Sequence, residues 1–230
     1  MGADIKGILF DKDGTLLDFH ATWNPVNWAA ALVVARNDPD LADLLMAVGG
    51  YDAATDRMRA GGLLAQETTH EIAVQWHKHV PGWIFDDLYK TIYRIYESAE
   101  PIPVPGLVET LTHYSEEACP MGIVTSDAES PAKSQMQALG LSDHFDFIAG
   151  YDSGYSAKPD PAAVLAFCKQ TNLAPENIAF VGDNAHDMET GRRAGVGLVI
   201  GVLTGTSGRD DLAPLADHVF ESICDLPTVI

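Results

Sequence analysis

The feature that most constrains the fold of this chain is a repeated alternation of short apolar runs with helical segments. The apolar runs show no regular polar alternation, so each is expected to form a strand buried on both faces, as in a parallel sheet covered by helices. The predicted strands lie at residues 5–10, 120–125, 145–149, 178–182, 197–202 and near 218–220. One predicted helix ends near 117, and three others lie at about 131–139, 161–171 and 186–194. The pattern therefore predicts an α/β fold with a doubly wound, Rossmann-like parallel sheet.

A helical segment of different character separates the first predicted strand from the second. It contains all four tryptophans of the chain, and one stretch repeats apolar residues at spacings of three and four, which indicates a helix with one buried face. These residues are Leu88, Ile92, Ile95 and Tyr96. The proline-rich sequence at 101–106 ends the segment. We therefore predict a core domain formed by residues 1–18 and 103–230, with a helical domain at 19–102 inserted after the first strand.

Composition limits the class of function. The chain has 33 Asp and Glu residues against 14 Lys and Arg residues, a formal net charge of −19, which opposes binding to nucleic acid or anionic lipid. No apolar run reaches the roughly 18 residues of a membrane helix, and no basic segment followed by an apolar stretch opens the sequence. Three widely spaced cysteines fit neither a disulfide framework nor a zinc site. We therefore expect a soluble, cytoplasmic protein that binds neither nucleic acid nor membranes.

Polar residues follow the first predicted strand at once. Asp11 and Asp13 lie two positions apart at the strand end, so both carboxylates can face the same cavity. Two carboxylates held this close repel each other unless a cation lies between them or one is protonated. Oxygen ligands without histidine or cysteine favour Mg²⁺, and Gly14 would let the backbone turn and present its amides to an anion. For this segment alone, an acidic turn without a function is the alternative.

Three further polar segments follow later predicted strands. Thr125 and Ser126 offer hydroxyls that suit a phosphate oxygen, although such residues also cap helices. Lys158, held before a proline, could offer a fixed positive charge, although a solvated surface lysine is the alternative. Asp183 could complete the metal site while also capping a helix, and Asp187, one turn later, could orient Lys158. Because the carboxyl ends of parallel strands lie at one edge of a sheet, the four segments are expected to form one site.

In their order along the chain, these segments resemble the haloacid dehalogenase superfamily of aspartate-nucleophile phosphotransferases. The matching motifs are DxDGT at 11–15, the hydroxyl of Thr125, Lys158, and GDxxxD at 182–187. The sequences AKPDP around Lys158 and AGVGLVIGVLTGT at 194–206 are similar to the phosphoglycolate phosphatase-like subfamily. One departure is Ser126, where many such proteins carry asparagine. The resemblance covers essentially the whole chain, and the inserted helical domain looks like the C1-type cap of this superfamily.

The resemblance implies a two-step phosphatase reaction. Asp11 would attack phosphorus and form an aspartyl phosphate, while Asp13 would protonate the leaving alkoxide and later activate water. It also implies Mg²⁺ held by Asp11, Asp13 and Asp183, with the backbone carbonyl of Asp13 as its ligand. The residues implied to bind or support the phosphate are Thr15, Thr125, Ser126 and Lys158, with Gly14 and Asp187 in supporting roles. The presence of Asp13 disfavours dehalogenation.

The cap is expected to set the choice of substrate. Its polar, glycine-bounded stretch at 49–62 could present Arg57 or Arg59 to a carboxylate such as that of 2-phosphoglycolate, although an ordinary surface loop is the alternative. The expected partner is therefore a small phosphorylated metabolite. A β-phosphoglucomutase-like phosphomutase and a non-enzymatic phosphate-binding protein stay open as alternatives, as does the choice between a monomer and a homodimer.

Overall fold

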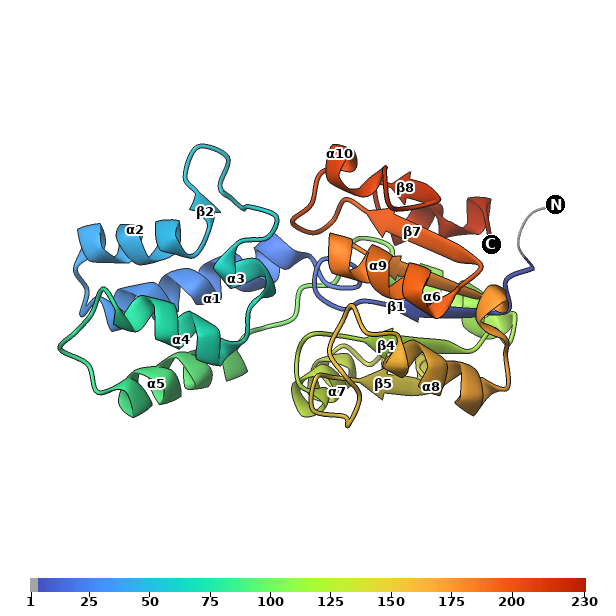
Figure 1. The fold of residues 1–230 in the computed structure, drawn as a ribbon, viewed down its shortest axis with the longest axis horizontal. Helices are drawn as coiled ribbons and strands as arrows, with labels where there is room; N and C mark the ends of the chain where they lie inside the picture. The colour runs from blue at the N-terminus through green and yellow to red at the C-terminus, as the bar shows by residue number, and fades with distance from the viewer. Residues whose placement is uncertain (1–3) are drawn as a thin grey trace. The chain divides into compact units, whose positions relative to one another are not determined.

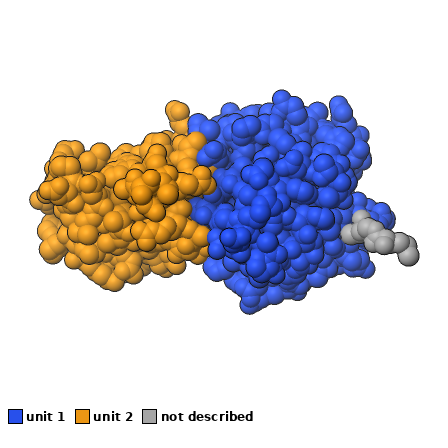
Figure 2. Space-filling model, turned by 90° about the horizontal axis from the view of Figure 1, so that it is seen from above, with its two compact units in different colours: residues 1–18, 101–230 blue, residues 19–100 orange. Residues whose placement is uncertain are grey.

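The computed structural model describes residues 4–230 and contains two compact units (Figure 1). The first is Met1–Asp18 together with Pro101–Ile230, and the second is Phe19–Glu100, as coloured in Figure 2. Each unit has its own hydrophobic core. Within residues 4–230, every helix falls short of the length and apolar character needed to cross a membrane.

The first unit is built on a six-stranded parallel sheet with the strand order β5-β4-β1-β6-β7-β8. Its strands are β1 (Gly7–Phe10), β4 (Met121–Val124), β5 (Phe147–Ala149), β6 (Ile178–Gly182), β7 (Leu198–Val202) and β8 (His218–Phe220). Its helices are α6 (Leu107–Glu116), α7 (Glu129–Ala138), α8 (Ala162–Thr171), α9 (Ala185–Ala194) and α10 (Arg209–Leu212), with the 3₁₀-helices η1 (Ser142–His144), η2 (Pro175–Asn177) and η3 (Ile223–Thr228). These elements confirm the predicted α/β fold with a doubly wound parallel sheet.

Helices cover both faces of this sheet, as Figure 1 shows. Successive residues of a strand point to opposite faces. On β1, Ile8 and Phe10 face a core shared with α6, α7 and η3, whereas Leu9 faces a core shared with α8, α9 and α10. All three side chains are fully buried. A strand between two helical layers therefore requires an apolar run without polar alternation, which is the pattern of the sequence.

The strand order reverses at β1. From β1 the chain adds β4 and β5 on one side of the sheet and then crosses over to add β6, β7 and β8 on the other side. Ile8 of β1 consequently lies opposite Met121 of β4 and also opposite Ala179 of β6. Doubly wound folds bind ligands where the connections diverge at such a reversal, outside the carboxyl ends of the strands.

The second unit is mainly helical. Its elements are α1 (Phe19–Val34), α2 (Pro39–Val48), β2 (Tyr51–Asp52), β3 (Arg57–Met58), α3 (Leu63–Gln66), α4 (Thr69–His77) and α5 (Phe85–Glu97). Two indole rings join its helices: Trp76 donates a hydrogen bond to the Leu45 carbonyl oxygen (3.0 Å) and Trp83 donates one to the Val34 carbonyl oxygen (2.9 Å). Indoles packed in a core with satisfied N–H groups are typical of an independent domain, so this unit packs around its own interior.

The stretch at 49–62, where a surface loop was one expectation, contains the short antiparallel hairpin β2–β3. Tyr51 pairs with Met58, which is buried, and the Tyr51 hydroxyl donates a hydrogen bond to Asp56 Oδ1 (2.7 Å). The sequence could not reveal this hairpin because strands of two residues are too short to show an alternating pattern.

Candidate active site

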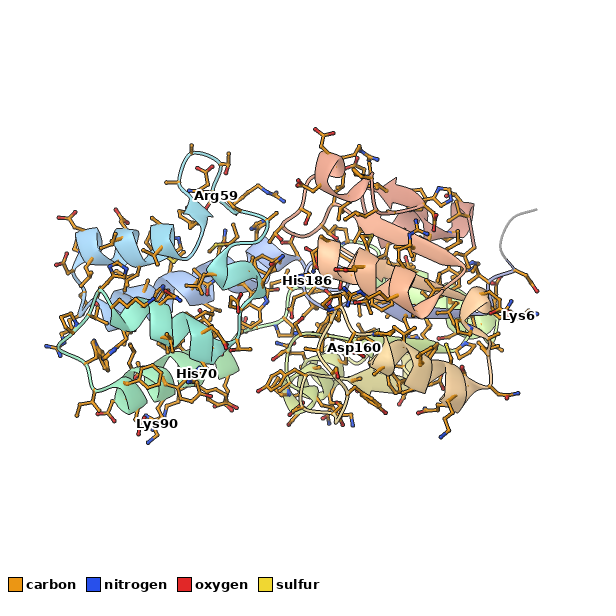
Figure 3. The ribbon with its side chains drawn as sticks, viewed as in Figure 1. Lys6, Arg59, His70, Lys90, Asp160 and His186 are labelled. Carbon is orange, nitrogen blue, oxygen red and sulfur yellow. The ribbon has the colours of Figure 1, made fainter. Side chains whose placement is uncertain are left out.

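The polar segments lie at the carboxyl edge of the sheet because each one follows a parallel strand. Asp11 comes directly after β1, Thr125 directly after β4 and Asp183 directly after β6, while Lys158 lies in the connection from β5 to α8. Since β1 lies between β4 and β6, the end of β1 is the centre of this group. Figure 3 labels two residues that are close to site residues in the sequence: Asp160, two positions after Lys158, and His186, directly before Asp187.

Lys158 joins two of the predicted site residues. Its ammonium nitrogen lies 2.5 Å from Asp11 Oδ1 and 2.6 Å from Asp187 Oδ1, and its side chain is only 3% exposed. Burial alone would lower the pKa of Lys158, but the carboxylates of Asp11 and Asp187 outweigh burial and raise the pKa above its usual value. The lysine is therefore a fixed positive charge beside Asp11, which excludes the alternative of a solvated surface lysine.

Asp187 is held in place by the start of α9. Its Oδ2 accepts hydrogen bonds from the backbone amides of Asp183 (3.1 Å) and Asn184 (3.2 Å), while Asn184 Oδ1 accepts one from the Asp187 amide (3.2 Å). These bonds form a capping box, which satisfies amides at the helix N-terminus. A Cβ on Gly182 would lie 2.3 Å from the Asp187 Cβ, so the backbone must come close here. With Oδ2 committed to the helix, Oδ1 of Asp187 is directed at Lys158.

Three buried carboxylates form a cluster that could hold a metal ion. One ligand oxygen each from Asp11, Asp183 and Asp187 lies within 4.8 Å of the others. Asp13 contributes no carboxylate oxygen to this group, and its expected contact with the metal, through the backbone carbonyl, stays a prediction. With the one positive charge of Lys158, the three carboxylates would leave two negative charges in a buried site. Oxygen donors with this excess of negative charge fit a divalent cation.

The pKa values of the cluster express the same imbalance. Burial raises the pKa of Asp11 well above its usual value, and the negative charges of Asp187 and Asp183 add to this while Lys158 opposes it. Burial, followed by the charge of Asp187, raises the pKa of Asp183 to about 7. Without a cation, a proton on Asp183 is thus part of the counter-charge of the site near neutral pH.

Two glycines pack directly against Asp183. Gly14 has a positive φ of 90°, and a Cβ there would lie 2.6 Å from Asp183 Cγ. A Cβ on Gly205 would lie 1.8 Å from Asp183 Oδ2. The loop after β7 contributes two further contacts: Thr206 donates its amide to Asp183 Oδ2 (2.9 Å), and the Thr204 hydroxyl donates to the Gly14 carbonyl oxygen (2.6 Å). This loop was missed as part of the site, although a polar Thr-Gly-Thr after a buried strand is the same signal that identified the other segments.

Asp13 belongs to a second group of charges, which surrounds the fully buried Lys12. Its Oδ2 lies 2.7 Å from the ammonium nitrogen of Lys12, which is also 3.1 Å from Asp127 Oδ2 and 2.5 Å from Gln135 Oε1. Burial would lower the pKa of Lys12, but Asp13 and Asp127 raise it above the usual value. Sequence reasoning missed Lys12, Asp127 and Gln135, since the first is separated from Gln135 by 123 positions.

The predicted hydroxyls differ in their surroundings. Thr125 Oγ1 accepts a hydrogen bond from the Asp127 amide (3.1 Å), so the Thr125 hydroxyl hydrogen can be donated elsewhere. Thr15 Oγ1 is buried and has no hydrogen-bond partner within residues 4–230. Ser126 is exposed. Two of the three hydroxyls are thus buried donors without an assigned acceptor in the part of the chain that the structure describes, which suits a bound anion.

The two arginines predicted to contact the substrate lie in the second unit. Arg57 is the first residue of β3 and Arg59 directly follows this strand, and both are exposed. Figure 3 labels Arg59 beside the hairpin. The Arg59 amide donates a hydrogen bond to the Gly50 carbonyl oxygen (3.0 Å), which ties this end of the hairpin to its start. The role of both arginines in binding substrate stays a prediction.

Known proteins resemble this chain over nearly its whole length. A phosphoglycolate phosphatase of Escherichia coli (strain K12) is 27% identical over 240 residues, covering 97% of this chain and 91% of that protein. A phosphoglycolate phosphatase of Chromobacterium violaceum is 27% identical over 231 residues, covering 96% of this chain and 95% of that protein. Among solved structures, a predicted phosphoglycolate phosphatase from Haemophilus somnus 129PT has a TM-score of 0.75 at 22% identity and covers 98% of each chain.

The family model of the haloacid dehalogenase-like hydrolases matches residues 5–195 of this chain. That range begins at the strand before Asp11 and ends with α9, which carries Asp187. It therefore contains the whole cluster of Asp11, Lys158, Asp183 and Asp187. The resemblance seen in the sequence is confirmed, and the chain belongs to the haloacid dehalogenase-like hydrolases.

Proposed function

We propose that this protein is a Mg²⁺-dependent phosphatase that hydrolyses a small phosphate monoester through an aspartyl phosphate. The observation that carries the proposal is the buried contact between Asp11 and Lys158 at 2.5 Å. A carboxylate nucleophile and a phosphate dianion repel each other, so a cation fixed beside the nucleophile is what this reaction needs. The relatives named phosphoglycolate phosphatases support the same reaction class.

The reaction has two transfers. In the first, an Asp11 carboxylate oxygen forms a bond to phosphorus while the bond from phosphorus to the ester oxygen breaks, and Asp13 gives its proton to that oxygen. In the second, water forms a bond to phosphorus while the aspartyl oxygen leaves, and the Asp13 carboxylate accepts a proton from the water. Inorganic phosphate and the original carboxylate and acid result.

Lys158, Thr125 and Thr15 would bind the oxygens of the transferred phosphoryl group. The charge on these oxygens changes little in a loose transition state, so fixed donors serve both transfers. The carboxylates of Asp11 and Asp183, with the Asp13 backbone carbonyl, would hold Mg²⁺, which when bound offsets the negative charge of nucleophile and phosphate. Asp187 would act through Lys158, whose ammonium it orients.

We propose 2-phosphoglycolate as the substrate and the helical unit as a cap over the site. The unit is joined to the rest of the chain by one connection at each end, after Asp18 and before Pro101, as a movable lid requires. With Lys158 committed to the phosphate, the carboxylate of this substrate needs another cation. Arg57 and Arg59, both exposed on the hairpin, are the proposed partners.

A panel of phosphate esters assayed with Mg²⁺ and with EDTA tests the proposed function. We expect metal-dependent release of inorganic phosphate, which Asp11→Asn abolishes and Lys133→Met, a change at an exposed lysine on α7, leaves unaltered. Brief incubation with substrate should also add the mass of one phosphoryl group to the peptide that contains Asp11. A sugar phosphate product in place of inorganic phosphate would indicate a phosphomutase, and phosphate binding without turnover would indicate a binding protein.

A further inference from the structure

Lys12 is a fully buried lysine to which the reaction above assigns no role. It lies between Asp11 and Asp13 in the sequence, and its side chain is 0% exposed. An ammonium group has three N–H donors, and three acceptors surround this one: Asp13 Oδ2 at 2.7 Å, Asp127 Oδ2 at 3.1 Å and Gln135 Oε1 at 2.5 Å. Lysines are almost never buried unless they are paired in this way, so the arrangement points to a specific role.

We propose that Lys12 is a positioning residue that holds the carboxylate of Asp13 where it can protonate the leaving oxygen of the substrate. The inference rests on the proposed phosphatase function, in which Asp13 is the general acid. General acid catalysis requires the acid within hydrogen-bond reach of the oxygen that receives the proton. A carboxylate held at Oδ2 by a fixed ammonium has far fewer orientations than one on a freely rotating side chain.

The hold on Asp13 is rigid because Lys12 itself is fixed at both ends. At the backbone end, its carbonyl oxygen accepts hydrogen bonds from the amides of Leu16 (2.9 Å) and Leu17 (3.0 Å), which close the turn after β1. At the ammonium end, Gln135 reaches in from α7 and Asp127 from the loop after β4. Two separate elements of the first unit thus fix the nitrogen that contacts Asp13.

The contacts of Lys12 also extend, through Asp127, to Thr125 in the loop after β4. The Asp127 amide donates to Thr125 Oγ1 (3.1 Å), and Asp127 Oδ1 accepts from the Ala128 amide (2.7 Å), which leaves Oδ2 for Lys12. Thr125 would bind an oxygen on phosphorus, and Asp13 would reach the ester oxygen bonded to that same phosphorus. A shared support through Asp127 and Lys12 sets the distance between these two groups, as the reaction demands.

A buried ion network can also serve stability alone, so the test must separate the two roles. The measured quantity is kcat/KM for 4-nitrophenyl phosphate and for phenyl phosphate, which reports the first transfer. The two esters share the same ring, but 4-nitrophenolate leaves readily without a proton whereas phenolate needs one. Loss of stability or of phosphate binding lowers both values alike, whereas misplacement of the acid lowers the phenyl phosphate value more.

For Lys12→Met we expect the phenyl phosphate value to fall by about tenfold or more beyond any fall for 4-nitrophenyl phosphate. Asp13→Asn should show the same preference, and adding Lys12→Met to it should increase the preference no further, because Lys12 acts through Asp13. The matched control is Lys133→Met, which removes an exposed lysine of the same first unit that pairs with Glu129 on α7. It should change the ratio of the two values by less than about twofold.

Should Lys12→Met fail to fold, the variant Lys12→Met with Asp127→Asn takes its place, because it leaves no charge on Asp127 without a partner. Equal losses on the two esters, no loss on either, or an additive effect with Asp13→Asn would each overturn the positioning role while leaving the phosphatase intact. A wild-type protein that hydrolyses neither ester with Mg²⁺ would overturn the proposed function and this inference with it.

Discussion

Removal of the metal from the candidate active site should make the stability of the first unit depend on pH. The perturbed group is Asp183, whose side chain is buried and whose pKa is raised to about 7 by burial and by the charge of Asp187. A group with a raised pKa binds its proton more tightly in the folded state than in the unfolded state. Its stabilising effect is therefore complete below its unfolded pKa near 4 and is lost as the pH rises through about 7.

The structure sets the size of this effect. A shift from 3.8 to about 7 corresponds to roughly three pKa units, or about 4 kcal/mol at 1.36 kcal/mol per unit. Because neighbouring carboxylates interact with Asp183, we expect about 2–4 kcal/mol of unfolding free energy to be lost between about pH 4 and pH 7 in EDTA. Saturating Mg²⁺ replaces the protons as the counter-charge, so it should remove most of this pH dependence.

The two units allow an internally controlled assay. Cys168 is buried on α8 against the sheet of the first unit, so its reaction with a thiol reagent during urea unfolding reports that unit. All four tryptophans lie in the second unit, so their fluorescence reports the other one. We expect the urea midpoint for Cys168 labelling to fall with rising pH in EDTA and to stay level in Mg²⁺. Equal slopes in the two conditions, or an equal shift of the tryptophan signal, would refute the reasoning.

Contacts of the candidate active site and of the proposed cap lead to three further predictions. Lys158→Met removes the cation beside Asp11, so steady-state kinetics should show a fall in kcat of about 10²–10³-fold and weaker inhibition by vanadate. Unchanged vanadate inhibition would place the lysine away from the phosphate. Gly205→Ala puts a methyl group 1.8 Å from Asp183 Oδ2, so it should lower the free energy of unfolding in urea by about 1–3 kcal/mol and weaken activation by Mg²⁺. A variant with normal activation would contradict this packing. Arg57→Ala with Arg59→Ala should raise KM for 2-phosphoglycolate by about tenfold, which corresponds to a charge-assisted hydrogen bond of about 1.5 kcal/mol. KM for 4-nitrophenyl phosphate should stay unchanged. Equal effects on both substrates would indicate a structural role in the hairpin.

Much of the site could be predicted because strand ends are visible in the sequence. Asp11 and Asp183 each follow a buried apolar run, and a parallel sheet brings the carboxyl ends of such runs to one edge. The same logic linked Lys158 to this edge, where its ammonium contacts Asp11. Element order and buried strands thus carry information about which distant residues meet.

What could not be predicted depends on side-chain reach and on close packing. Alternation along an extended chain indicates that Lys12 points away from Asp11, but it does not reveal that the Lys12 ammonium contacts Asp127 and Gln135 there. Gly205 is important because its missing Cβ leaves room for Asp183, and a missing atom has no sequence pattern of its own. The contact of Asp13 with Lys12 has the same origin, since the directions of these side chains decide it.

The aspartates of the site fall into two groups, and each group contains its own lysine. Asp11, Asp183 and Asp187 with Lys158 form one group, and a divalent cation would bring that group to neutrality. Asp13 is held apart from it by its own cation, Lys12. Lys158 contacts the proposed nucleophile and Lys12 contacts the proposed general acid, so each of the two reacting carboxylates is fixed by a lysine of its own. The placement of Lys12 and Lys158 on different aspartates is therefore itself part of the proposed mechanism.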